Sequence, residues 1–385
     1  MGAAPKITRI VVTKYAHEIE NLTLEDVYGF DMVYNEGARL GGGGSILIIE
    51  TDAGVRAEIP GGIDARTANY LLGRNPLERE IIWQDLKRLF RGSTSTPPGD
   101  HDVALWDIAG KLAGVPIAAL LGGWRTRLPC YASTYHGDEN GGLSTPEDYG
   151  EFALHCKEEY GYPAFKIHGW IGAPITREVA AVLAIRDAVG DDMDIMLDPA
   201  GAFGTFDDVL KVGRACDEAQ YFWYEDAFRG GGVSQFVHAK LRQFIKTPLL
   251  MGEHIRGLET KADAIHAGAV DYLRAGSGRD GGITGVMKLA VLAEAYGLDV
   301  ELHGGGLAHR HCMAAIRNTN YYELGLVHPN VKHTKAPIYA DPKWRDELYS
   351  VDSEGCVAVP DGPGLGVELD WDFINANKTG ETVYE

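Results

Sequence analysis

From residue 128 onward, short apolar segments alternate with segments of helical periodicity, and the unit recurs roughly every thirty residues. The apolar segments are LPCYAST, AFKIHG, DIMLDPA, YFWYEDA, PLLMGEH, VDYLRA and LDVELHGG. A strand-helix repeat of this length predicts parallel βα units, and seven or eight such units most often close into a barrel. A doubly wound open sheet is the alternative. No G-x-G-x-x-G follows any of these segments, which disfavours a nucleotide-binding sheet.

The N-terminal part of the chain has a different pattern. ITRIVVTKY and SILIIETDAGVRAEI are β-branched runs that predict antiparallel strands, with a turn in the second run at residues 52–54. Residues 62–123 have helical periodicity. The chain has 385 residues, whereas single cores usually stop growing near ~250–300 residues. Two domains are therefore expected.

Residues 28–44, YGFDMVYNEGARLGGGG, lie between the two predicted strands and are rich in glycine and aromatic residues. One interpretation is a flexible linker, and the other is a loop that closes over a site. Gly41 to Gly44 lead into a strand and not into a helix, which disfavours a phosphate-binding loop.

The charge of the chain excludes several classes of partner. The formal net charge is -19, and lysine and arginine form no cluster. We therefore expect no nucleic acid partner and no binding to an anionic membrane surface. No apolar run approaches the ~18 residues that a transmembrane helix requires, so no membrane span is predicted.

The cysteines and the N-terminus bear on location. The five cysteines are scattered and never form C-x-x-C, which favours neither a disulfide framework nor a zinc site. The first residues, MGAAPKITRI, lack the apolar region of a secretion signal. A reducing cytoplasm is the expected location.

Three successive apolar segments end in an acidic residue. Asp198, Glu225 and Glu253 follow one another at intervals of 27 and 28 residues. In a βα barrel the carboxyl ends of the strands converge on the face that carries active sites. Three neighbouring carboxylates repel one another unless a cation lies between them, and all-oxygen ligands suit Mg²⁺ best. The competing interpretation is that each acid caps the following helix or pairs with an arginine.

The flanking segments carry basic groups. Lys166 and His168 are two residues apart in FKIHGW, a spacing that places both side chains on one face of a strand. His303 ends the segment VELH on the other flank. The pattern is thus a base, three candidate metal ligands and a second base. His168 has a second interpretation, as a core histidine that only orients Lys166.

These features together resemble the enolase superfamily, in its mandelate-racemase-like branch. The resemblance extends over nearly the whole chain and includes ALWDIAGKLAGVPIAALLGG, the acidic series, GGITGVMKLAVLAEAYGLDVELH and VAVPDGPGLGVELD. It implies an α/β fold, a modified TIM barrel (β/α)7β with an N-terminal α+β capping domain. The implied capping domain covers residues 1–127 and is completed by about 351–385, and the barrel catalytic domain covers 128–350.

The resemblance also implies a chemistry. Members of the branch abstract the proton α to a carboxylate, and one Mg²⁺ per subunit stabilises the resulting enediolate. We expect a sugar-acid dehydratase in which Lys166, with a pKa lowered by the cation and by desolvation, removes the proton. Glu323 matches the family acid that contacts the substrate carboxylate, and His303 would protonate the departing β-hydroxyl. The expected partners are a small anionic sugar acid and further copies of the chain.

Two other functions remain open on the same residues. A racemase, epimerase or cycloisomerase would begin with the same proton abstraction. A catalytically idle barrel that binds a sugar acid would keep the fold and lose the reaction. Retention of the acidic series, Lys166 and His303 together favours an enzyme.

The sequence departs from the branch at three positions. His168 stands where Lys-x-Lys is usual, so either Lys166 or His168 could carry the acid-base role. Gly276 stands where an Asp normally pairs with the histidine equivalent to His303, which makes His303 a better general acid than base. Ala200 replaces an Asn that is common two residues after the first ligand.

Overall fold

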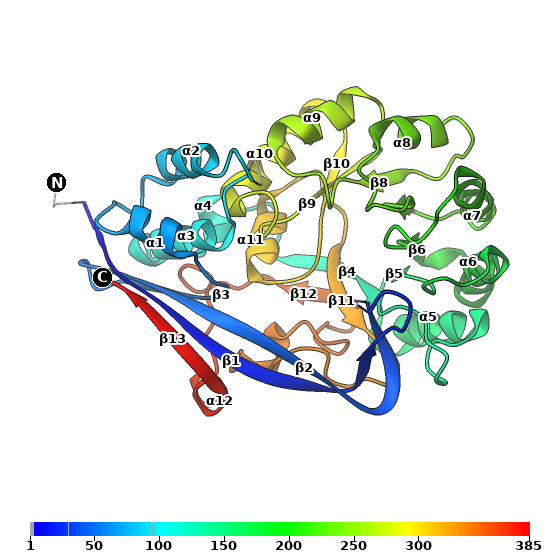
Figure 1. Cartoon of the computed structure of the whole chain (residues 1–385), viewed down its shortest axis with the longest axis horizontal. Helices are drawn as coiled ribbons and strands as arrows, with labels where there is room; N and C mark the ends of the chain where they lie inside the picture. The colour runs from blue at the N-terminus through cyan, green and yellow to red at the C-terminus, as the bar shows by residue number, and fades with distance from the viewer. Residues whose placement is uncertain (1–3, 30, 94–95) are drawn as a thin grey trace.

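The computed structural model describes residues 4–29, 31–93 and 96–385. Within these residues, eight parallel strands follow one another around a curved sheet in the order β10-β9-β8-β7-β6-β5-β4-β11 (Figure 1). The strands are β4 (Arg127–Thr134), β5 (Ala164–Ile167), β6 (Asp194–Leu197), β7 (Trp223–Glu225), β8 (Leu249–Met251), β9 (Tyr272–Ala275), β10 (Asp299–Leu302) and β11 (Tyr322–Val327). A short strand, β12 (Cys356–Ala358), pairs antiparallel with β4.

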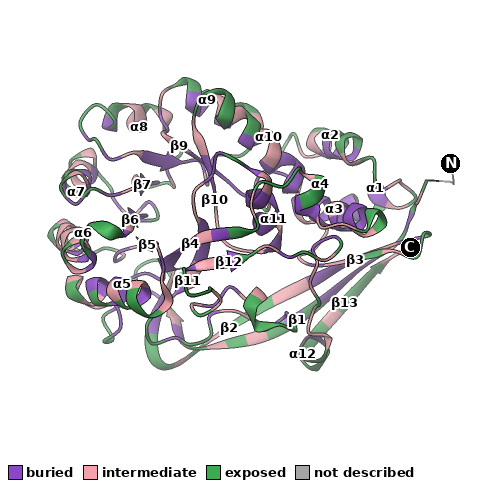
Figure 2. Ribbon diagram, turned by 180° about the vertical axis from the view of Figure 1, so that it is seen from behind, coloured by how far each residue is buried: buried purple, intermediate pink, exposed green. Residues whose placement is uncertain are grey.

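A helix follows each of the first seven strands of this sheet in the chain. These helices are α5 (Pro146–Tyr160), α6 (Ile175–Val189), α7 (Phe206–Glu218), α8 (Gln235–Leu241), α9 (Leu258–His266), α10 (Gly282–Ala295) and α11 (Leu307–Ala315). The strands are buried, and the exposed residues of the helices lie on their outer side (Figure 2). Strands buried on both faces appear in a sequence as short continuous apolar runs. The predicted modified barrel, (β/α)7β, is confirmed.

A second sheet extends along one side of the barrel (Figure 1). Its strand order is β13-β1-β2-β3, and every neighbouring pair is antiparallel. The strands are β1 (Ile7–Leu24), β2 (Met32–Thr51), β3 (Arg56–Pro60) and β13 (Lys378–Tyr384). The helices beside it are α1 (Ala65–Leu71), α2 (Arg79–Leu89), α3 (Asp100–Ala113), α4 (Ile117–Leu120) and α12 (Trp371–Ala376). The capping domain is therefore α+β, whereas the boundaries at 127 and 351 stay predictions.

The predicted loop at residues 28–44 is wrong over most of its length. From Met32 onward the segment is strand β2, and Gly41 to Gly44 pair with residues 15–18 of β1. Glycine is needed here for close approach. A Cβ at Gly44 would lie 2.2 Å from the hydroxyl oxygen of Tyr15, and one at Gly42 would lie 2.8 Å from the ring of His17. The glycines admit aromatic rings across the strand pair, and they do not form a flexible loop.

The turn between β1 and β2 reaches the barrel. Val33 forms an isolated bridge with His136, and the side chain of Asn140 donates to the carbonyl of Tyr34 at 2.9 Å. Figure 1 shows this end of the hairpin curling toward β11 and α5. The capping sheet thereby brings one end of its longest hairpin to the carboxyl ends of the barrel strands.

Contacts of α2 and α3 with the start of α10 join the capping domain to the barrel. Asp102 accepts hydrogen bonds from the backbone nitrogen and the hydroxyl of Thr284 at 2.9 and 2.7 Å. Trp83 donates from its indole nitrogen to the carbonyl of Gly281 at 2.9 Å.

Among the residues that the structure describes, every helix is too short or too polar to cross a lipid bilayer.

Candidate active site

The three predicted metal ligands meet at the carboxyl ends of adjacent strands. Asp198 follows β6 directly, Glu225 is the last residue of β7, and Glu253 lies two residues beyond β8. One oxygen atom of each carboxylate lies within 4.8 Å of those of the other two. The equal intervals in the sequence therefore correspond to convergence in space, as parallel strands of similar length require.

Lys166 lies beneath these carboxylates and is fully buried. Its Nζ is 3.2 Å from an oxygen of Asp198, 3.0 Å from one of Glu225 and 2.9 Å from one of Glu323. Burial opposes the charge of this lysine, but the carboxylates of Glu225 and Glu323 outweigh burial and hold its pKa well above the ordinary value. Among these carboxylates Lys166 is held in its protonated form. The lowered pKa expected from the sequence depends on a bound cation and stays a prediction.

Arg274, in β9, is a buried residue of the site that the sequence reasoning missed. Its Nε lies 2.7 Å from Glu225 Oε1, and one terminal nitrogen lies 2.8 Å from Glu323 Oε2. The same terminal nitrogen donates to the hydroxyl of Tyr131 at 3.1 Å. An arginine inside a buried strand needs carboxylate partners, because an unpaired buried charge is costly. An arginine inside the otherwise apolar segment YLRA was the feature of the sequence that could have indicated this residue.

Glu323, in β11, is held by both cations. In addition to Lys166 and Arg274, the backbone nitrogen of Gly304 donates to it at 2.5 Å. Burial works against its charge, but Lys166 and Arg274 hold the pKa of Glu323 well below the ordinary value. An ionised carboxylate only accepts hydrogen bonds. Contact between Glu323 and a substrate carboxylate therefore stays a prediction, and its oxygens here hold the two cations in place.

The balance of charge favours a divalent cation at this place. Five carboxylates gather at the strand ends, namely those of Asp198, Glu225, Asp226, Glu253 and Glu323. Three permanent cations face them, namely Lys166, Arg274 and Arg279. The acidic groups outnumber these cations, and their hard oxygen atoms fit a cation such as Mg²⁺, whose charge would hold the buried acids ionised. The donor set in the structure thus agrees with the metal that the spacing predicted.

His168 stands beside the ligand cluster in a fixed orientation. Its Nδ1 lies 2.6 Å from the carbonyl oxygen of Thr134, and its Nε2 lies 3.3 Å from Asp198. A carbonyl can only accept, so Nδ1 carries a hydrogen and Nε2 is the ring atom that can exchange a proton. His168 lines a cavity of about 510 Å³, whereas Lys166 is not among the residues that line it.

His303 lines the same cavity from the end of β10. Its Nε2 lies 3.2 Å from Glu253, and its side chain is 35% exposed. Burial lowers the pKa of His303 to about 4, although Glu323 and Glu253 act in the opposite direction. His303 is therefore neutral at neutral pH in this arrangement.

Position 276 is a glycine, so it offers no acidic side chain to His303, as expected from the sequence. Asp280, the nearest acid along the chain, accepts from the backbone nitrogen of Gly276 at 2.9 Å and pairs with Lys261 at 2.7 Å. A Cβ at Gly276 would lie 3.7 Å from the carbonyl oxygen of His303, which is an ordinary contact. Space therefore does not exclude a side chain here, and Glu253 is the carboxylate that pairs with His303.

Ala200 supports the first ligand through its backbone. Its nitrogen donates to the second oxygen of Asp198 at 2.8 Å. The residue has a φ of 50° and lines the cavity. At this position the first ligand is thus supported by the main chain.

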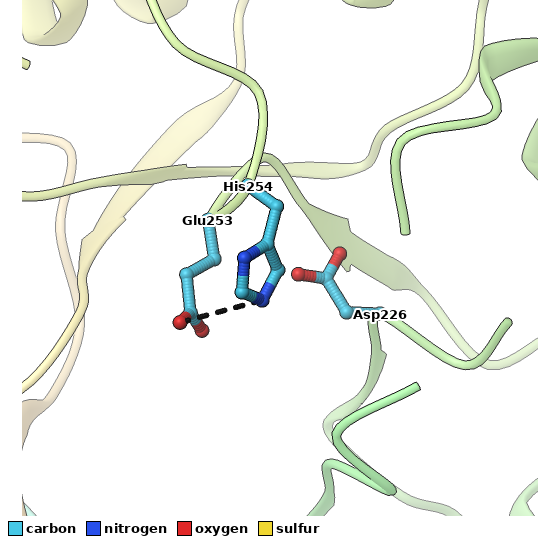
Figure 3. A group of neighbouring side chains, drawn as sticks. All are labelled: Asp226, Glu253 and His254. Atoms are coloured by element: carbon cyan, nitrogen blue, oxygen red, sulfur yellow. Dashed lines mark ion pairs between the residues drawn. The ribbon is translucent and has the colours of Figure 1, made fainter. Parts of the chain in front are cut away.

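A second group of possible ligands shares Glu253. Asp226, Glu253 and His254 face one another across the ends of β7 and β8 (Figure 3). Asp226 is 3% exposed, and neither carboxylate oxygen has a hydrogen-bond partner within the described part of the chain. Burial and the charge of Glu225 raise the pKa of Asp226 well above the ordinary value. Figure 3 shows its carboxylate directed toward the ring of His254.

The remaining walls of the cavity come from outside the strand ends. Ile19, Asp31 and Met32 belong to the β1–β2 hairpin or its turn, and Thr334 and Lys335 follow β11. The cavity is therefore enclosed jointly by the barrel and the capping sheet.

Comparison with known families agrees with this geometry. A family described as "Enolase C-terminal domain-like" matches residues 148–373. A second, the mandelate racemase / muconate lactonizing enzyme N-terminal domain, matches residues 36–122. The chain belongs to the enolase superfamily. The resemblance read from its motifs, including the mandelate-racemase-like branch, is confirmed.

Similar members of the enolase superfamily include sugar-acid enzymes. The crystal structure of D-glucarate dehydratase from Agrobacterium tumefaciens, complexed with magnesium, superimposes with a TM-score of 0.83 at 30% identity. That match covers 97% of this chain and 99% of the other. D-galactarolactone cycloisomerase from Agrobacterium fabrum is 29% identical over 319 residues, which are 80% of this chain and 82% of that protein. D-gluconate dehydratase from Thermoproteus tenax is 27% identical over 79% of this chain, and the match spans only 61% of its length.

Proposed function

We propose that this chain is a Mg²⁺-dependent sugar-acid dehydratase. It abstracts the proton α to the carboxylate of a sugar acid and then eliminates water from the β carbon. The observation that carries the proposal is the pair His168 and His303, which line one cavity beside three converging carboxylates. The similar D-glucarate dehydratase and D-gluconate dehydratase support the same class of reaction.

Asp198, Glu225 and Glu253 would hold one Mg²⁺ per subunit. When bound, the cation would neutralise the negative charge that develops on the substrate carboxylate as the proton leaves. Lys166 and Arg274 keep the buried carboxylates apart and oriented through the ion pairs described above.

His168 is the better candidate for the base. The sequence alone favoured Lys166, with His168 as the alternative, but Lys166 is fully buried while His168 lines the cavity. In the proposed step the α carbon–hydrogen bond breaks, its proton moves to Nε2 of His168, and its electrons form the new carbon–carbon double bond. Lys166 then acts as a positioning residue through Asp198 and Glu225.

His303 would assist departure of the β-hydroxyl. The electrons released at the α carbon move to form a double bond between the α and β carbons, the carbon–oxygen bond breaks with its electrons on oxygen, and a proton from Nε2 of His303 leaves with the hydroxyl as water. With its pKa lowered to about 4 by burial, His303 needs added negative charge to hold that proton. A bound substrate carboxylate supplies such charge, because a nearby anion favours the protonated imidazole.

The test is exchange of the substrate α-hydrogen with deuterium oxide in the Mg²⁺-loaded enzyme, across a panel of sugar acids, together with detection of the keto product. We expect exchange and water loss in the wild type and loss of exchange by about 10²–10⁴-fold in His168→Asn. His303→Asn should keep exchange and lose dehydration. Exchange that survives in His168→Asn and vanishes in Lys166→Met would restore Lys166 as the base. A wild type that binds sugar acids without any exchange would be an idle barrel.

A cycloisomerase is the second candidate. D-galactarolactone cycloisomerase, at 29% identity, favours it, because the same proton abstraction serves that class of reaction. Exchange without water loss would identify this function. Assembly into a homo-oligomer and a cytoplasmic location stay predictions.

A further inference from the structure

Lys335 is the one lysine or arginine among the described residues that line the cavity. It lies on the segment after β11, and its side chain also borders a neighbouring groove that includes Lys332 and Arg345. Within the described residues, the Nζ of Lys335 has only long contacts, at 3.5 Å to the carbonyl of Leu326 and 3.5 Å to the hydroxyl of Thr334. No carboxylate lies within ion-pair distance of it in the ranges that the structure describes.

The three carboxylates with the largest electrostatic influence on Lys335 are all engaged elsewhere. They are Asp346, Glu347 and Glu323, which oppose the lowering of the Lys335 pKa by burial. Asp346 pairs with Arg310 at 2.5 Å and accepts from the hydroxyl of Tyr322 at 2.7 Å. Glu323 is occupied by the two buried cations described above. Neither is free to neutralise the ammonium of Lys335.

Glu347 holds the backbone from which Lys335 projects. One of its oxygens accepts from the backbone nitrogen and the hydroxyl of Thr334 at 3.0 and 3.1 Å. The other accepts from the backbone nitrogen of Lys335 at 3.4 Å. Glu347 is itself 2% exposed and Thr334 4% exposed. The lysine is therefore presented from a fixed support, which reduces the entropy lost when it binds an anion.

We infer that Lys335 binds a second carboxylate of the substrate, so that the substrate class is an aldaric acid, with a carboxylate at both ends. This inference rests on the proposed function. A dianion entering a cavity lined by five acidic side chains meets repulsion that the metal would relieve only at the reacting end. Lys335 offers the second positive charge in a half-buried place, where a charge-assisted hydrogen bond is stronger than in open water.

The substrates named for the similar enzymes differ in the number of carboxylates that their parent acids carry. D-glucarate and D-galactarolactone derive from acids that are oxidised at both ends, whereas D-gluconate is oxidised at one end. An aldonic acid ends in a neutral hydroxymethyl group, which gives Lys335 no charge to pair with. Lys335 should therefore lower the KM for aldarates and have little effect on the KM for aldonates.

The experiment compares matched substrates, galactarate against galactonate and glucarate against gluconate, in the Mg²⁺-loaded wild type, Lys335→Met and Lys335→Arg. Lys332→Met is the control, because Lys332 is exposed on the same segment and does not line the cavity. We expect Lys335→Met to raise KM for aldarates at least tenfold, with kcat changed little and aldonates unaffected. Lys335→Arg should restore part of the loss, and Lys332→Met should behave as the wild type.

A binding measurement separates this inference from the proposed reaction. Calorimetric titration of galactarate into Mg²⁺-loaded His168→Asn, with and without Lys335→Met, needs no turnover. Weaker binding in the double variant alone supports the inference even if no sugar acid reacts, in which case only the proposed function fails. Equal loss on aldarates and aldonates would make Lys335 a structural residue and overturn the inference. A wild-type preference for aldonates would do the same.

Discussion

Lys166 and His168 are two positions apart in the sequence, yet their side chains lie in different environments. Lys166 is inside β5 with its ammonium among three carboxylates, and His168 lies just beyond the strand, on the cavity wall. The alternation of a strand predicts a shared face, which the sequence can show. It does not predict depth along the barrel axis, because depth depends on where the strand ends. Which of two same-face residues meets a ligand is therefore a property of the assembled barrel.

Arg274→Met should destabilise the protein strongly. Removal of the guanidinium leaves Glu225 and Glu323 with Lys166 as their only shared cation, and breaking a buried pair costs about 3–5 kcal/mol. Urea unfolding monitored by circular dichroism measures the difference in free energy. The control is Arg317→Met, whose exposed pair with Glu294 should contribute less than about 1 kcal/mol. Similar losses in both variants would contradict the assigned role of Arg274.

Glu225→Gln should abolish turnover while the fold is retained. The amide has nearly the same shape as the carboxylate, but it removes one negative ligand from the cluster. Isothermal calorimetry should show Mg²⁺ affinity at least tenfold weaker than in the wild type. Glu294→Gln, a change of an exposed acid, serves as the control. Unchanged Mg²⁺ affinity in Glu225→Gln would remove this residue from the ligand set.

At the scale of elements, the β1–β2 hairpin differs most from its sequence expectation. Glycine runs usually indicate flexible loops, but Gly42 and Gly44 sit opposite aromatic side chains in a regular strand pair. The strand identity of this segment depends on which residues of β1 face it, and that register is a tertiary property. The barrel elements, by contrast, carry their own periodicity, so the strand-helix order was predictable from local sequence alone.

Gly44→Ala should destabilise the hairpin. The added Cβ would lie 2.2 Å from the hydroxyl oxygen of Tyr15, so that ring must move, and overpacking of this kind costs about 1–3 kcal/mol. Gly41→Ala is the matched control, because a Cβ there meets nothing within 4 Å. Thermal unfolding should give a lower melting temperature for Gly44→Ala than for Gly41→Ala. If both melt together with the wild type, close packing is not the reason for the glycines.

For the whole molecule, the site depends on contacts that no single segment contains. The cavity is closed by the hairpin of one domain and the strand ends of the other, and Asp102 and Thr284 fasten the domains together. The metal ligands could be predicted, because strand ends of a barrel converge by geometry. Arg274 and the hairpin residues Asp31 and Met32 could not, because the groups that they meet are far away in the sequence. Lys335 could not, because its place on the cavity wall depends on the folded path of the segment after β11.

His311 makes the union of the two domains sensitive to acid. Its Nδ1 accepts from the backbone nitrogen of Ala118 in α4, and its Nε2 lies 3.2 Å from the carbonyl of Leu365. An accepting Nδ1 requires a neutral ring, and burial lowers the pKa of His311 to about 4. Because the folded pKa lies below the unfolded value of about 6.5, this contribution to stability is complete above pH 6.5. It is lost as the pH falls from 6.5 toward 4.

The measurement is the free energy of unfolding as a function of pH in the wild type and in His311→Gln. The glutamine keeps an acceptor and a donor but does not titrate. The variant should lose stability less steeply between pH 6.5 and 4, by up to about 1.4 kcal/mol per pH unit, the value for one proton. Parallel curves would show that His311 does not titrate against folding.

The pairing of β1 with β13 has a consequence for the order in which the protein can be completed. Ile10 lies opposite Tyr384, so one edge of the capping sheet is built from segments separated by almost the entire chain. During synthesis, β1 to β3 can form a meander early, but the free edge of β1 must wait until β13 has left the ribosome. An unpaired strand edge is a template for association with other chains. The nascent protein thus carries an unpaired edge on β1 until β13 has been made, and the pairing of β13 removes that aggregation hazard.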